Sequence, residues 1–149
     1  MSYVNLQYHI VFSTKQRRPL LSPPDRLARI CEYIGGILRE QDARMLAANG
    51  APDHVHLAVI IDPTLAVADV VRVVKANSSR WIHETFPDMR DVSWQDGYAA
   101  FSVSSSMLPK VVAYIRAQAD HHKRMTFEEE LIALLDRHGI EYDKRYIFA

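Results

Sequence analysis

The chain has 149 residues, of which 48% are hydrophobic and 24% charged, and its 18 basic and 18 acidic side chains cancel. These values are typical of one soluble globular domain. No apolar stretch approaches the ~20 residues of a membrane-spanning helix, and the N-terminus lacks a signal-peptide pattern. The single cysteine, Cys31, excludes an internal disulfide. We therefore expect a cytoplasmic protein.

The balance of charge differs along the chain. Residues 1–124 carry 15 Lys and Arg against 12 Asp and Glu, whereas residues 125–149 carry 3 against 6. An acidic tail thus masks a mildly basic body, and only the body would have to face a polyanion. This distribution permits nucleic-acid binding without diagnosing it.

Hydrophobic periodicity and turn residues divide the chain into strands and helices. In chain order we expect a strand at 4–15, a helix at 25–42, strands at 43–50 and 54–62, a helix at 65–86, a strand at 98–104, a helix at 104–125 and a last helix from 126 to Gly139. The pair Gly35 and Gly36 indicates a close contact between the first helix and the sheet. A serine is expected to cap the third helix, with Pro109 in its first turn, and Thr126 to open a capping box.

The order β-α-β-β-α-β followed by two helices is that of the ferredoxin-like split βαβ fold, which RRM domains share. We therefore predict an α+β protein with a four-stranded antiparallel sheet, helices on one face and additional C-terminal helices. Residues 1–149 would form a single domain, with a core at 1–125 and a C-terminal helix and tail at 126–149. Such a fold hosts many functions, so the function must be argued from a site.

Two histidines stand two residues apart in the apolar segment "PDHVHLAVII". On a strand, His54 and His56 would point to the same face of the sheet, while Val55 and Leu57 would point to the other. Two neighbouring imidazoles form a natural pair of metal ligands. The alternative is two separate histidines, each hydrogen-bonded at a sheet surface.

Two histidines alone would be an incomplete metal site, so we expect a third ligand from the helix that contains "YIRAQADHH". At 3.6 residues per turn, Tyr114, Gln118 and His121 lie on one stripe of this helix. The stripe would present a hydroxyl and an amide oxygen to the same site. The alternative is a helix in which Tyr114 packs and its polar neighbours are solvated.

Five segments together resemble the single-tyrosine HUH transposases: "YHIVFSTKQRRPLL", "PDHVHLAVII", "SSRW", "WQDGY" and "YIRAQADHH". This family comprises small insertion-sequence enzymes and REP-associated relatives that move DNA as a single strand. The ending "KRMTFEEELIALLDRHGIEYDKRYIF" is similar to a tail found in one branch of the family. The resemblance runs in the same order from about Tyr8 to the end, with Ala51 standing where the family would have methionine.

The resemblance implies that His54, His56 and Gln118 bind a divalent metal ion and that Tyr114 is the nucleophile. The ion would be Mg²⁺ or Mn²⁺, and imidazole together with an amide oxygen suits Mn²⁺ better. Zn²⁺ would prefer a third nitrogen, sulfur or carboxylate ligand. His121 is a possible alternative ligand, or a residue that supports the ligands. The implied reaction cleaves and rejoins single-stranded DNA through a 5′-phosphotyrosine intermediate.

The resemblance also implies partners: single-stranded DNA, DNA hairpins and a second copy of the chain in a homodimer, with the protein at the nucleoid when bound. Candidate phosphate contacts are the basic side chains Lys15, Arg17, Arg18, Arg72, Lys75, Arg80 and Arg116. Trp81 or Trp94 could stack on an unpaired base, although a core position is the usual one for tryptophan in such segments.

Three other functions stay open at this point. A regulator that binds DNA hairpins would keep the fold without turnover, although the presence of all four expected residues argues against it. An RRM-type RNA-binding module would place aromatic side chains on its central strands, where this chain has histidines. A zinc hydrolase would need a carboxylate base beside the histidines, and none is evident in the sequence.

Overall fold

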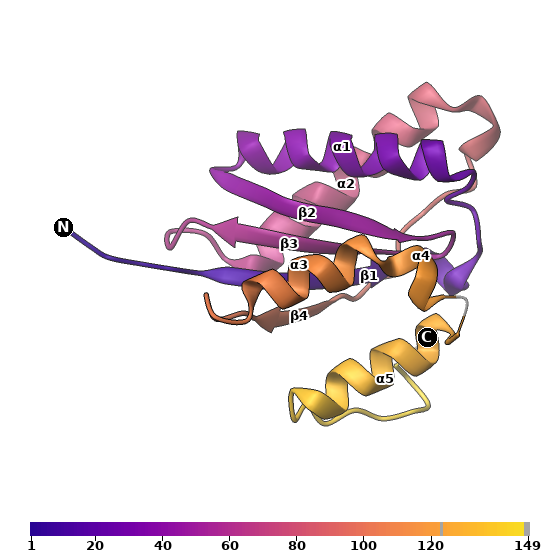
Figure 1. Ribbon diagram of the computed structural model, residues 1–149. Coiled ribbons are helices and arrows are strands. Elements are labelled where there is room, and N and C mark those ends of the chain that lie inside the picture. Colours follow the sequence, from indigo (N-terminus) through magenta and orange to yellow (C-terminus); the bar gives the residue numbers. More distant parts are fainter. Residues whose placement is uncertain (123, 148–149) are drawn as a thin grey trace.

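The computed structural model describes residues 1–122 and 124–147 (Figure 1). Within these residues, four strands form an antiparallel sheet in the order β2-β3-β1-β4. The strands are β1 (Gln7–Ser13), β2 (Ala43–Ala51), β3 (His54–Ile61) and β4 (Ala99–Ser102). This is the strand order of the ferredoxin-like fold, so the predicted α+β architecture is confirmed.

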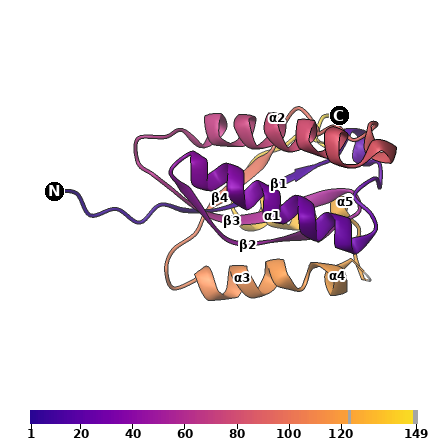
Figure 2. The ribbon, with the colours of Figure 1, turned by 90° about the horizontal axis from the view of Figure 1, so that it is seen from above.

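The main core lies between one face of the sheet and two long helices, α1 (Pro24–Glu40) and α2 (Val67–Thr85). Figure 1 shows α1 above the sheet, and Figure 2, seen from above, shows α1 and α2 on the near side of the strands. Side chains alternate along a strand, so Ile10 and Phe12 of β1 enter this core while Val11 points away from it. Because α1 and α2 each bury an apolar stripe here, the opposite face of the sheet is left for other elements.

The opposite face is covered by C-terminal helices. The helices α3 (Leu108–Arg116) and α4 (Gln118–His121) run along β2, and α5 (Phe127–Arg137) packs below the sheet (Figures 1 and 2). An RRM-type surface needs an open sheet face for stacked bases, so this cover argues against that alternative. No helix in the described part of the chain is long and apolar enough to cross a membrane. The described residues also form two 3₁₀ turns, η1 (Lys15–Arg17) and η2 (Pro87–Met89).

The helix expected at 104–125 is shorter and broken. It begins at Leu108 after Met107, which makes no side-chain capping bond, so the predicted serine cap is wrong. Ala117 leaves the helical conformation, and the Asp120 amide donates to its carbonyl oxygen at 3.0 Å. This bond spans three residues instead of four and tightens the chain between α3 and α4. The predicted capping box at Thr126 is present.

Gly35 and Gly36 of α1 face different surroundings. A Cβ at Gly35 would lie 2.9 Å from Cε of Met45 in β2, which confirms the expected close contact between helix and sheet. A Cβ at Gly36 would meet nothing nearer than an Arg39 nitrogen at 3.7 Å.

We expect Gly36→Ala to raise the free energy of unfolding by about 0.5–1 kcal/mol, because alanine loses less backbone entropy in a helix. Urea denaturation measures the free energy of unfolding of the wild type, Gly36→Ala and Gly35→Ala. A Gly36→Ala protein less stable than the wild type or than Gly35→Ala would contradict the prediction.

Candidate functional site

The two histidines of β3 point to the face of the sheet that the C-terminal helices cover. Val55 and Leu57 alternate with them and enter the main core, so His54 and His56 share a face as the strand periodicity predicts. Both imidazoles are 0% exposed. The alternative of two histidines at an open sheet surface is therefore wrong.

The residues expected from the third helix reach the same place. Oε1 of Gln118, a buried side chain, lies 3.1 Å from Nε2 of His54. Tyr114 is half-buried, with its ring centre 5.9 Å from that of His56. The structure thus brings together the four residues that the sequence singled out, although the helix between Tyr114 and Gln118 is broken.

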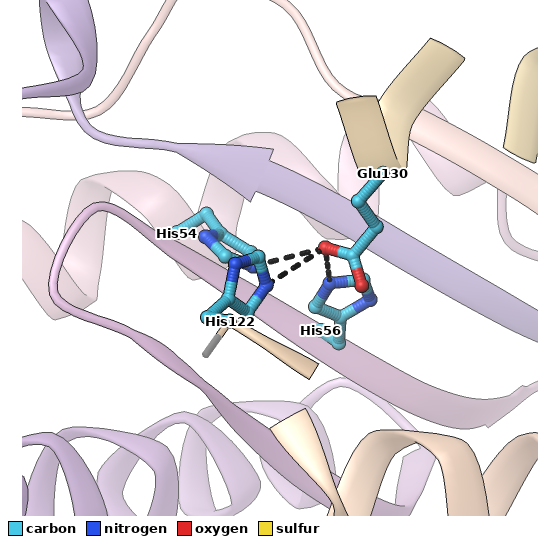
Figure 3. Close-up of side chains that lie close together, drawn as sticks. All are labelled: His54, His56, His122 and Glu130. Carbon is cyan, nitrogen blue, oxygen red and sulfur yellow. Dashed lines mark hydrogen bonds and ion pairs between the residues drawn. The ribbon is translucent and has the colours of Figure 1, made fainter. Parts of the chain in front are cut away.

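Glu130 of α5, which the sequence argument missed, points toward His54, His56 and His122 (Figure 3). Its Oε1 atom is 3.0 Å from Nε2 of His56, 3.1 Å from Nε2 of His122 and 3.2 Å from Nε2 of His54. The Glu130 side chain is 1% exposed. Three imidazole nitrogens therefore converge on one buried carboxylate oxygen.

The second oxygen of the same carboxylate reaches the nucleophile candidate. Oε2 of Glu130 accepts a hydrogen bond from Nε2 of Gln118 at 2.9 Å and another from the Tyr114 hydroxyl. One carboxylate thus spans the distance between the histidine pair and Tyr114.

The packing of α5 explains why Glu130 points inward. Phe127, three residues earlier, and Leu134, four residues later, are buried in a cluster with Val11 and Phe101 of the sheet. Residues three and four apart share one helix face, so Glu130 follows these apolar side chains toward the sheet. Glutamates in a first helical turn usually face solvent, where their negative charge interacts favourably with the helix dipole. The signal that could have identified Glu130 is its place within the apolar stripe.

His122 contributes to the cluster an imidazole of the kind that the sequence argument expected from His121. The Nε2 atom of His122 is 3.0 Å from Oε1 of Gln118, and its side chain is 14% exposed. The side chain of His121 lies outside the described residues, so its role stays a prediction. The expectation for His121 assumed an unbroken helix, whereas the chain bends at Ala117.

Electrostatics hold the Tyr114 hydroxyl in its neutral form. Burial alone would raise the pKa of Glu130, but hydrogen bonds with His54 and His56 outweigh burial and hold this pKa far below its usual range. Burial and the hydrogen bond to Glu130 both raise the pKa of Tyr114 well above its usual range. Burial lowers the pKa of His56 to about 4. In this arrangement Tyr114 is a neutral phenol, which is a weak nucleophile.

The cluster has the dimensions of a metal site. One ligand atom each from His54, His56, His122 and Glu130 lie within 4.8 Å of one another. In an octahedral shell with bonds of about 2.0–2.1 Å, neighbouring ligand atoms are about 2.8–3.0 Å apart. The separations between Oε1 of Glu130 and the three nitrogens, 3.0, 3.1 and 3.2 Å, lie at or slightly above this edge. The residues therefore fit a divalent cation.

The donor types also bear on which cation fits. Imidazole nitrogens mixed with carboxylate and amide oxygens suit Mn²⁺ better than Mg²⁺, which prefers oxygen ligands. The sequence argument against Zn²⁺ assumed that a third nitrogen or a carboxylate was missing. That argument is wrong, because His122 and Glu130 supply both. The carboxylate that a zinc hydrolase would need is also present.

Two cavities open beside the cluster. One of about 580 Å³ lies between α1 and β2, and one of about 440 Å³ lies between Asp53 and the start of α5. His122 lines both cavities, so a ligand would reach the cluster from the side on which His122 lies. A larger cavity of about 990 Å³ lies between α1 and α2, across the sheet from the cluster, and is lined by Tyr33, Arg80 and Trp81.

The basic residues expected to contact DNA do not form one surface. Lys15 and Arg18 are exposed at η1, where Arg17 pairs with Glu128 of α5. The remaining candidates lie on α2 and at the end of α3: Arg72, Lys75, Arg80 and Arg116. The Lys75 ammonium donates to the carbonyl oxygens of Gln95 at 2.8 Å and Gly97 at 2.6 Å. Lys75 therefore holds the 95–97 loop in this structure.

The two tryptophans differ in exposure. Trp94 is buried and donates from its indole nitrogen to Oγ of Ser78 at 3.0 Å, so it belongs to the core. Trp81 is partly exposed and stacks on Tyr33 with ring centres 4.4 Å apart. Of the two, Trp81 is the one with a face near solvent.

Comparison with known proteins places these residues in a family context. The family model "Transposase IS200 like" matches residues 2–118. The transposase of insertion sequence element IS200 from Salmonella typhimurium is 30% identical over 80% of this chain and 80% of its own length. The ISDra2 transposase TnpA of Deinococcus radiodurans is 26% identical over 77% of this chain and 85% of its own length.

Solved structures show the same architecture. A Deinococcus radiodurans R1 crystal structure, described as that of a transposase, matches with a TM-score of 0.63 and 25% identity, over 79% of this chain and 95% of that one. The structure of a REP-associated tyrosine transposase bound to a REP hairpin matches with a TM-score of 0.60 and 16% identity, over 82% of this chain and 72% of that one. This second match shows that the two proteins share a fold. The match of the family model ends at residue 118, before α5, so Glu130 lies outside the residues that this model covers. The chain belongs to the family of IS200-like transposases.

Proposed function

We propose that this transposase cleaves and rejoins single-stranded DNA in a metal-dependent reaction, with Tyr114 as the nucleophile. His54, His56 and Gln118 would hold Mg²⁺ or Mn²⁺, with His122 and Glu130 as further donors. The observation that carries the proposal is the position of Glu130, whose two oxygens contact the histidine pair and the Tyr114 hydroxyl. Ligands and nucleophile thus lie within reach of one phosphate-sized group.

In the proposed reaction, the Tyr114 hydroxyl oxygen attacks the scissile phosphorus and the 3′ oxygen leaves. The product is a 5′-phosphotyrosine and a free 3′-OH, and attack by another 3′-OH reverses the step onto a new partner. A bound cation would offset the negative charge of the phosphate. The phosphate has to come in line with Tyr114, where Oε2 of Glu130 lies in this structure. Glu130 therefore has to give up its contact with Tyr114 before attack.

DNA recognition in this proposal rests on basic side chains that contact backbone phosphates. Lys15 and Arg18 are the best placed, because both are exposed near the edge where the cluster is approached. Lys75 would have to release two carbonyl oxygens first. Recognition of hairpin ends, a homodimer, and a cytoplasmic location at the nucleoid complete the proposal, supported by the family relationship.

A second candidate is a DNA-hairpin-binding regulator without turnover. Two observations favour it: the buried ligands, and the Tyr114 hydroxyl held in its neutral form by Glu130. Both candidates share the fold and the DNA partner, so they differ in whether a covalent bond to DNA ever forms.

The deciding experiment is a covalent-adduct assay. Purified protein is mixed with Mn²⁺ or Mg²⁺ and labelled single-stranded DNA that contains hairpins, and the products are separated on a denaturing gel. We expect a slow-migrating adduct that needs metal and disappears completely in Tyr114→Phe, because phenylalanine lacks the attacking oxygen. Tyr98→Phe, which removes the hydroxyl of an exposed tyrosine, is the matched control and keeps the adduct. An adduct in Tyr114→Phe would refute the nucleophile, and hairpin binding without any adduct would favour the regulator.

A further inference from the structure

Each imidazole of the β3 pair has a partner on the side that faces away from Glu130. Nδ1 of His54 lies 2.7 Å from Oδ1 of Asp53, the preceding residue. Nδ1 of His56 lies 2.8 Å from Nε2 of His9 in β1. Neither Asp53 nor His9 belongs to the cluster of proposed metal ligands, and the sequence argument assigned neither of them a role.

The sheet register brings His9 behind His56. His9 pairs with Ala58 across the β1–β3 ladder, two residues from His56, so the two histidines are diagonal neighbours on one face. Their rings are nearly parallel, 29° apart with centres at 5.0 Å, and His9 is buried. A buried imidazole in this position has a fixed hydrogen-bond partner and no access to bulk water.

The direction of the hydrogen bond at His54 follows from the chemistry of Asp53. An ionised carboxylate only accepts hydrogen bonds, so Nδ1 of His54 carries the proton and donates it. The Nε2 atom of His54 then faces inward, toward acceptor oxygens of Gln118 at 3.1 Å and Glu130 at 3.2 Å, so it also carries a proton in this structure, which a bound cation would displace. Asp53 therefore fixes the ring with Nε2 toward the metal cluster.

The bond between His9 and His56 can run in either direction. In this structure Nε2 of His56 faces the Glu130 carboxylate at 3.0 Å, so in a neutral ring the proton lies on Nε2 and Nδ1 accepts from His9. Binding a cation through Nε2 requires the lone pair there, so the proton has to lie on Nδ1 and point to His9. An imidazole serves both states because it can donate or accept.

We propose that His9 and Asp53 are positioning residues that present Nε2 of His56 and Nε2 of His54 to a divalent cation. Asp53 acts as a fixed acceptor, and His9 as a two-way partner whose tautomer changes together with that of His56. The inference rests on the proposed function, in that both histidines hold the metal through Nε2.

The first test is the affinity for Mn²⁺ alone, measured by titration calorimetry without DNA. We expect His9→Leu and Asp53→Ala each to weaken Kd by ~10–100-fold, the usual effect of removing a group that orients a ligand. His9→Gln should stay near the wild-type value, because an amide both donates and accepts, and Asp53→Asn should recover part of the loss. His83→Leu is the matched control, since His83 lies on α2, away from the cluster, and hydrogen-bonds to the carbonyl oxygen of Val92.

The second test follows the tautomers of the wild-type protein, so it does not depend on a variant that folds. In ¹⁵N-histidine NMR with Zn²⁺ as the diamagnetic probe, we expect the proton of His56 to move from Nε2 to Nδ1 and that of His9 to do the same. An unchanged His9 tautomer, or a wild-type Kd in His9→Leu, would overturn the inference and leave the metal site standing. A wild-type protein that binds no Mn²⁺ would overturn both this inference and the metal dependence of the proposed function.

Discussion

The Tyr114 hydroxyl of a Glu130→Gln protein is expected to ionise at lower pH than that of the wild type. The Glu130 carboxylate raises the pKa of Tyr114 through both a hydrogen bond and its negative charge, whereas a glutamine keeps an acceptor oxygen without the charge. We expect a decrease of at least ~1 pKa unit, the typical effect of a like charge at hydrogen-bond distance. Burial of Tyr114 persists in the variant, so the pKa stays above the usual value of a tyrosine.

The measurement is a pH titration of ¹³C-labelled tyrosines by NMR, with Tyr114→Phe to assign the resonance. Glu128→Gln is the matched control, because it neutralises a glutamate in the same helical turn, one that pairs with Arg17. An equal Tyr114 pKa in the Glu130→Gln and wild-type proteins would show that burial alone holds the phenol neutral.

Gly50→Ala is expected to disrupt the hairpin that delivers His54 to the cluster. A Cβ at Gly50 would lie 2.1 Å from the backbone oxygen of His54 and 3.0 Å from Cα of Val55, and neither backbone atom can yield without moving the strand. We expect the free energy of unfolding to fall by at least ~2 kcal/mol, within the range of severe overpacking. The affinity for Mn²⁺ should fall as well, because His54 shifts with its carbonyl.

Chemical denaturation and Mn²⁺ titration check both effects. The matched control is Gly97→Ala in the exposed loop after Trp94, where a Cβ would meet nothing nearer than a side-chain nitrogen of Gln95 at 4.0 Å. A Gly50→Ala protein with wild-type stability would mean that β2 and β3 can separate at this point without cost.

The part of the site that depends on local periodicity could be predicted from sequence. His54 and His56 share a face because strands repeat every two residues. Tyr114 and Gln118 are expected at one site because residues four apart share a helix face, and they reach it although the helix breaks at Ala117. The fold class followed from the order of strand and helix patterns along the chain. These inferences need no knowledge of how distant segments pack.

The rest of the site depends on contacts between distant segments. Glu130 reaches the histidines because α5 docks on Val11 and Phe101, and its neighbours Glu128 and Glu129 are indistinguishable from it by composition. His9 stands behind His56 through the β1–β3 register, 47 residues away in sequence. Such positions are set by tertiary packing, which a single sequence does not encode in any short pattern.

The position of Glu130 in the last helix has a consequence for how the protein matures. Ribosomes synthesise chains from the N-terminus, and all four strands are complete at Ser102, well before residue 130 is added. The sheet can therefore form on the ribosome with its imidazoles in place but without their carboxylate partner. During that interval His54 and His56 lack the carboxylate that contacts both of them in the finished fold. Arrival of α5 is the step that closes the cluster.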